Sequence, residues 1–225
     1  MSATRSFVLN CVCGHEFEAV LWDSVDVAEA APLKSKILSG EMNQIQCVKC
    51  KKRSYVEKNL LYRDSNQKLL IQMYPQSDRP RWVKLEAEHK KAINKRAIKR
   101  RAHLRGYTLR LAFGHQEMVE KIRIFDSHLD DRLIEMIKLK ILEQDDVVKE
   151  TPDAELLFSQ YLADEGELHF KLTSLEKNLS QTIVISYEHY EELLEAEQHL
   201  STEKPAEKIV CQGMYVSVNK TRILH

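Results

Sequence analysis

Residues 47–50 have the sequence Cys47-Val48-Lys49-Cys50, and residues 11–14 have the sequence Cys11-Val12-Cys13-Gly14. In a Cys-x-x-Cys knuckle, one tight turn presents two thiolates to a single metal ion. Each pair follows a short segment of strand-like composition, and two knuckles that follow strands close the site of a zinc ribbon. A site filled by four cysteines has no open coordination position, so its metal is structural. We therefore predict a structural Zn²⁺ ion bound by Cys11, Cys13, Cys47 and Cys50.

The first cysteine pair leaves alternatives open. It is one residue shorter than a Cys-x-x-Cys knuckle, and His15 stands close enough in the sequence to replace one of its sulfurs. The four cysteines also fit a degenerate site that has lost its metal, or a redox-active dithiol. The fifth cysteine, Cys211, stands alone in an apparent strand, which predicts a buried, unreactive thiol.

The charges of this chain are strongly segregated. The 225 residues include 34 basic and 34 acidic side chains, a formal net charge of zero, which excludes a globally basic nucleic-acid coat and an acidic disordered chain. Residues 1–105 nevertheless carry 21 basic and 11 acidic side chains, and residues 106–225 carry 13 and 23. The N-terminus has no apolar signal-like segment, and no stretch approaches the roughly 18 apolar residues that span a bilayer. We therefore expect a cytoplasmic protein without a membrane partner.

Nine of the positive charges fall between Lys84 and Arg105, in a segment of helical composition. Cations clustered on a helix are typical of surfaces that bind phosphates or acidic proteins. The candidate binding residues are Lys90, Lys91, Lys95, Arg96, Lys99, Arg100, Arg101 and Arg105. The partner is nucleic acid, an acidic protein, or the acidic half of this chain or of a second copy, and the last pairing would produce a homo-oligomer.

The hydrophobic pattern predicts an α+β fold with three segments: a zinc-ribbon-like β-hairpin unit (1–75), a basic helical linker (76–105) and an α/β domain (106–225). Period-two alternation and turn residues predict a hairpin over 6–22 and strands at 43–46, 54–62, 68–74, 107–113, 155–162, 166–173, 181–187 and 209–218. Helical spacing predicts helices at 32–39, 81–105, 118–125, 129–141 and 188–200.

Several blocks in order resemble one family. They are the hairpin Gly14-His15-Glu16-Phe17-Glu18, the segment 33–41 (Leu-Lys-Ser-Lys-Ile-Leu-Ser-Gly-Glu), the second cysteine pair, Leu60-Leu61-Tyr62-Arg63-Asp64, and the segments 120–126 and 129–135. From about Phe7 to Leu142 the chain resembles the CpXC domain, a bacterial and archaeal module named for two Cys-Pro-x-Cys motifs. Val12 and Val48 stand where that pattern has proline. The resemblance implies the metal site and the architecture, and it implies no reaction.

These observations favour a non-enzymatic, zinc-stabilised binding or regulatory module. The sequence contains no His-Glu-x-x-His, no Gly-x-Ser-x-Gly and no phosphate-binding loop. The alternative is a hydrolase-type enzyme with a dispersed site near an acidic helix at 126–135, where Asp126, Asp130 and Asp131 lie. A charged surface would favour the binding module, and a cleft that unites Asp130, Arg132 and a histidine would favour the enzyme.

Overall fold

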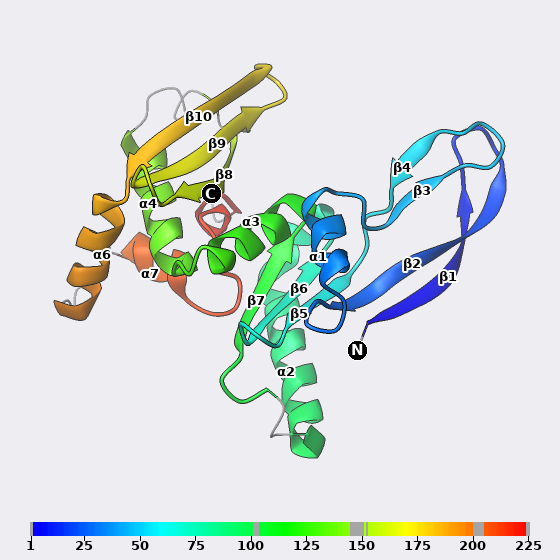
Figure 1. Ribbon diagram of the computed structural model, residues 1–225, viewed down its shortest axis with the longest axis horizontal. Helices are drawn as coiled ribbons and strands as arrows, with labels where there is room; N and C mark the ends of the chain where they lie inside the picture. Colours follow the sequence, from blue (N-terminus) through cyan, green and yellow to red (C-terminus); the bar gives the residue numbers. More distant parts are fainter. Residues whose placement is uncertain (1, 101–103, 145–150, 152, 200–204, 224–225) are drawn as a thin grey trace. The chain divides into compact units, whose positions relative to one another are not determined.

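The structure is a computed structural model that describes residues 2–100, 104–144, 151, 153–199 and 205–223 (Figure 1). It is a mixed α+β protein, as the hydrophobic pattern predicts. The contacts divide the chain into two compact units, residues 1–119 and 120–225. The first unit carries 22 basic and 12 acidic side chains and the second carries 12 and 22, so the charge segregation follows the boundary between the units.

The first unit is built on a five-stranded sheet. Its strand order is β1-β2-β5-β6-β7, with β2 parallel to β5, β6 parallel to β7 and the other pairs antiparallel. The strands are β1 (Ala3–Asn10), β2 (Glu16–Asp26), β5 (Leu60–Asp64), β6 (Leu69–Tyr74) and β7 (Thr108–Phe113). The core strand β6 is almost continuously apolar, as expected for a strand that is covered on both faces. Helix α1 (Ala31–Leu38) contributes Leu33 and Ile37 to the buried core.

Strands β1 and β2 extend beyond the rest of the sheet as a two-stranded ribbon. The β1–β2 ribbon pairs from Thr4↔Trp22 to Asn10↔Glu16, while β5 joins β2 only at residues 24–26. A separate hairpin, β3 (Gln44–Gln46) and β4 (Arg53–Tyr55), lies beside the far end of this ribbon (Figure 1). The predicted single strand 54–62 is therefore wrong, because residues 56–59 leave the small hairpin before the main sheet begins at Leu60.

A short 3₁₀ helix, η1 (Gln76–Arg81), leads into α2 (Trp82–Arg100), which covers most of the predicted helix 81–105. The structure groups residues differently from the predicted segments 1–75, 76–105 and 106–225. Strand β7 follows α2 in the chain but pairs with β6 over the full register from Leu69↔Thr108 to Tyr74↔Phe113. Residues 106–119 therefore belong to the first compact unit.

The second unit packs helices against a three-stranded antiparallel sheet of order β10-β9-β8. The strands are β8 (Glu155–Leu162), β9 (Glu167–Ser174) and β10 (Leu179–Ser186), and the helices are α4 (Asp131–Gln144), α6 (Glu188–His199) and the end of α3 (His115–Asp126). Alternate residues of β8 and β9, among them Phe158 and Phe170, are buried in one core with Ile134 and Ile137 of α4.

The predicted final strand 209–218 is wrong. Residues Pro205–Cys211 form helix α7, and Asn219–Ile223 form a last short helix, α8. The β-branched Ile209 and Val210 favour a strand locally, but Val210 is fully buried against Leu139 and Val218, and this packing outweighs the local preference. The Nζ of Lys220 binds the carbonyls of Ile209, Val210 and Gln212 and so stabilises the C-terminal end of α7.

Candidate metal centre

The first cysteine pair lies in the tight loop that closes the β1–β2 ribbon. The strands stay paired up to Asn10↔Glu16, which leaves residues 11–15 for the loop. The backbone N–H of Cys11 donates to the carbonyl of His15 (2.9 Å), and the N–H of Gly14 donates to the carbonyl of Cys11 (2.8 Å). Gly14 has a φ of +79°, a conformation that glycine adopts without a steric cost. In this turn the Cys13 side chain is exposed and the Cys11 side chain is half-buried.

The second pair lies in the loop between β3 and β4. The hairpin pairs up to Gln46↔Arg53. The N–H of Cys47 donates to the carbonyl of Lys52 (3.0 Å), and the N–H of Lys51 donates to the carbonyl of Cys47 (2.9 Å). These two bonds fold residues 47–52 into a compact turn whose ends are fixed by the strands.

The two loops bring all four cysteine sulfurs together. Their Sγ atoms lie within 4.8 Å of one another, with Cys11 3.5 Å from Cys50 and Cys13 3.8 Å from Cys47. A tetrahedral Zn²⁺ with Zn–S bonds of about 2.3 Å separates its sulfurs by about 3.8 Å. The donor set therefore fits a tetrahedral metal ion. The shorter Cys-x-Cys pair contributes both of its sulfurs, whereas His15 is outside the group and stacks parallel to Phe17.

The four thiols are not equivalent. The Cys47 side chain is buried, and backbone N–H groups of Cys50 and Lys49 that favour its thiolate lower the pKa of Cys47 to about 6. The Cys13 amide lowers the pKa of Cys11, but desolvation and the neighbouring thiols outweigh it and raise that pKa to about 12.

Asn43 connects the two cysteine-bearing hairpins, and its role is not visible in the sequence. The backbone N–H of Trp22 donates to the Asn43 Oδ1 (2.7 Å), and the Asn43 Nδ2 donates to the carbonyl of Trp22 (3.2 Å). Its own carbonyl accepts from the N–H of Val56 (3.0 Å). The buried amide of Asn43 therefore replaces a strand partner at the free edge of β2 and holds the β3–β4 hairpin beside it.

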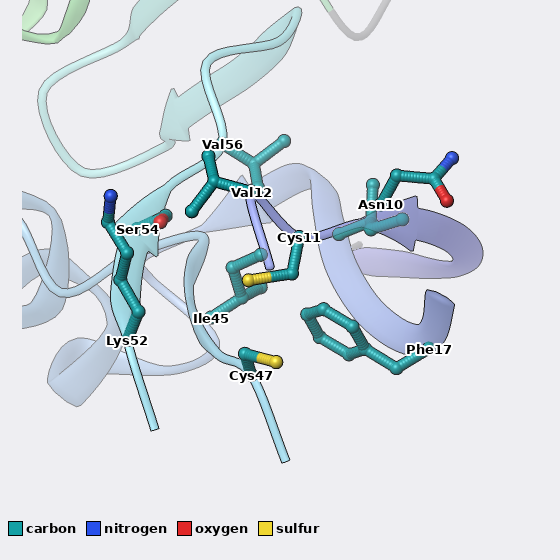
Figure 2. Close-up of a pocket in the computed structure, with 10 residues that line it drawn as sticks. Asn10, Cys11, Val12, Phe17, Ile45, Cys47, Lys52, Ser54 and Val56 are labelled. Carbon is teal, nitrogen blue, oxygen red and sulfur yellow. The ribbon is translucent and has the colours of Figure 1, made fainter. Parts of the chain in front are cut away.

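A cleft of about 190 Å³ opens beside the cysteines, between the two hairpins. Figure 2 shows Lys52 and Ser54 on one side of it, Asn10 and Phe17 on the other, and Cys11 and Cys47 between them. The complete lining is Leu9, Asn10, Cys11, Val12, Phe17, Ile45, Cys47, Lys52, Ser54 and Val56.

The predicted basic residues follow α2 and the turn after it. Lys90 and Lys91 are exposed, and Lys90 forms an ion pair with Glu86 at 2.7 Å. Helix α2 also contains Lys95, Arg96, Lys99 and Arg100. Arg105 is exposed just before Gly106, and Arg101 lies outside the described residues.

The acids of the 126–135 segment have structural partners. The guanidinium of Arg132 pairs with the carboxylate of Asp130 (2.6 Å), which also accepts from the Arg132 N–H (2.8 Å). Asp131 is buried, 3.1 Å from the Lys121 Nζ. These pairs favour structural roles for both acids over the hydrolase-type site that is the alternative.

Asp131 and Lys121 belong to a buried ionic network that is not visible in the sequence. Lys121 also contacts Glu135 (3.0 Å), and Lys138 contacts Glu135 (3.1 Å) and Glu120 (2.8 Å). All five side chains are at most 2% exposed. Backbone N–H groups of Phe158 and Val218 donate to Glu120 and Glu135 respectively, so the network fixes α3 and α4 to β8 and to the C-terminal segment.

Comparison with known proteins identifies the family of this chain. Among the residues that the structure describes, no helix is both long and apolar enough to cross a membrane. No curated protein and no solved structure matches the sequence. The family described as CpXC protein matches residues 9–138, more than half of the chain, and this range contains all four clustered cysteines. The chain therefore belongs to the CpXC protein family.

Proposed function

We propose that this protein is a non-enzymatic binding module whose cysteine loops are held together by one structural Zn²⁺ ion. The observation that carries the proposal is the approach of four Sγ atoms, from two separate hairpins, to within 4.8 Å of one another. Four thiolates in a tetrahedron favour Zn²⁺ over the hard cations Mg²⁺ and Ca²⁺, and they leave the metal no open position for a substrate.

The metal would supply stability that the two loops lack by themselves. Every residue of β4 is exposed, and β3 has only Ile45 partly buried. A two-stranded hairpin with so little buried surface is marginal in water. The cysteines would link it covalently, through the metal, to the β1–β2 ribbon, so that metal binding contributes directly to folding.

For the binding activity, we infer that the basic segment 84–105 engages an acidic partner, either nucleic acid or an acidic protein. The exposed Lys90, Lys91 and Arg105 lie on the unit that carries the excess of positive charge. Such a surface would bind phosphates or carboxylates with a strong dependence on salt. Reversing Lys90 and Lys91 to glutamate should weaken retention on heparin and on single-stranded DNA at low salt, while circular dichroism remains unchanged. Equal retention of the variant would rule this surface out.

The metal part of the proposal is tested by zinc analysis of cysteine variants. Wild type purified without chelator should contain about one zinc per chain by mass spectrometry. Cys47→Ser should lose the metal, whereas Cys211→Ser should keep it, because Cys211 lies in α7 and is outside the cluster. A zinc content that falls equally in both variants would contradict the assignment of these four ligands.

A further inference from the structure

The cleft between the cysteine loops combines an apolar floor with a cationic rim. Its floor is formed by Leu9, Phe17, Ile45 and Val56, side chains from both hairpins. Val12, at the tip of the first loop, also lines the cleft and is 82% exposed. An exposed valine beside an open apolar cleft is a surface that burial in a complex would stabilise.

The cationic side of the cleft is Lys52, which lies in the loop that carries the second cysteine pair, close in sequence to three further cations. Lys49, Lys51, Lys52 and Arg53 are all exposed, and none of them forms an ion pair with any residue that the structure describes. Lys52 itself lines the cleft, next to Ser54 (Figure 2). Four unpaired cations within five residues exceed the charge of about −2 that four thiolates and a Zn²⁺ ion carry together. The loop beside the cleft thus remains positive with the metal bound.

This combination fits a particular class of partner. The floor side chains are half-buried between two hairpins, which keeps a flat bilayer from covering them, and a nucleobase there would bury its polar edge against aliphatic groups. An aliphatic side chain of a peptide fits the floor, and carboxylates beside it in the same peptide reach the rim.

We propose that the cleft binds an acidic peptide segment of another protein, with one aliphatic side chain on the apolar floor and flanking carboxylates on Lys52 and its neighbours. The inference rests on the proposed function, because the metal holds together the two loops that form the cleft. It adds a second binding surface, separate in sequence from α2, and it defines the chemistry of the ligand.

Fluorescence anisotropy with a short labelled peptide, in which acidic residues flank one leucine, tests the proposal. Wild type should bind this peptide about tenfold more tightly than the same peptide with glycine in place of leucine. Ser54→Phe, which fills the cleft, should remove that preference. Lys52→Glu should weaken both peptides about tenfold, whereas Lys36→Glu, the same charge change at an exposed position on α1, should alter binding less than twofold.

Equal affinity for the leucine and glycine peptides, or equal effects of Lys52→Glu and Lys36→Glu, would overturn the proposal. It would also be overturned if Lys52→Glu reduced binding to an oligothymidine or to phosphatidylserine vesicles while wild type ignored the peptide. Zinc is measured in every sample. A wild type without zinc contradicts the proposed function itself, whereas a zinc-loaded wild type that does not distinguish the peptides contradicts only the role of the cleft.

Discussion

Lys138 offers a sharp test of how the second unit is stabilised. Its Nζ lies 2.8 Å from a carboxylate oxygen of Glu120 and 3.1 Å from one of Glu135, and all three side chains are at most 2% exposed. Lys121 is the second cation of the same network. Lys138→Met keeps a linear apolar side chain of similar length and removes only the charge and its hydrogen bonds.

The expected cost follows from the charges that remain. With Lys138 removed, Glu120 loses its ammonium partner and Glu135 keeps only Lys121, which also serves Asp131. Removal of one partner from a buried ion pair typically costs 3–5 kcal/mol, because it leaves an uncompensated buried charge. We therefore expect Lys138→Met to lower the free energy of unfolding by about 3–5 kcal/mol above pH 7, where Glu120, whose pKa burial raises to about 7, is ionised.

Urea denaturation followed by far-ultraviolet circular dichroism measures this loss. Tryptophan fluorescence is unsuitable, because Trp22 and Trp82 both lie in the first unit. The matched control is Lys140→Met, an exposed position on the same helix, which should change stability by less than about 0.5 kcal/mol. If both variants lose the same stability, the network does not hold the second unit together in the way that we describe.

Two further predictions concern pH and the cysteine hairpins. Burial is the main reason that the pKa of Glu120 rises from 4.5 to about 7 in the folded protein. At a pH between these two values, Glu120 is protonated in the folded protein and ionised in the unfolded chain. The free energy of unfolding should therefore fall as pH rises from about 5 to 7, and Glu120→Gln should remove this pH dependence. A wild-type stability that rises over that range, with the same profile in Glu120→Gln, would contradict the prediction. Asn43→Ala should cost about 1–3 kcal/mol, because it leaves the Trp22 backbone groups unpaired. It should also speed the loss of zinc to a chelator, whereas Asn59→Ala, at an exposed position, should do neither; equal rates of zinc loss would show that the Asn43 bridge does not support the centre.

The cysteine cluster was predictable because each pair of its members is adjacent in the sequence. Each cysteine pair lies within one turn, so short spacing alone brings two sulfurs together, and a strand before each turn indicates that two such pairs can meet. The spacing left His15 as an alternative to Cys11. The structure distinguishes them, because the Cys11 Sγ lies within the group of four sulfurs, whereas the His15 ring stacks on Phe17.

Features that depend on distant contacts were not predictable. Asn43 is an ordinary polar residue in the sequence, and only the free edge of β2 gives its amide two partners. Glu120 and Lys138 have the composition of exposed helix faces, yet they are buried together as a hydrogen-bonded pair. The strand expected at 209–218 fails for the same reason, since burial of Val210 in a helical cluster outweighs its β-branched side chain.

The most direct test of the central claim is X-ray absorption spectroscopy at the zinc edge of the purified protein. The arrangement of Cys11, Cys13, Cys47 and Cys50 predicts a single shell of four sulfurs at about 2.3 Å from the metal. A protein that carries no zinc would contradict the account, and so would a shell in which nitrogen or oxygen replaces one of the four sulfurs.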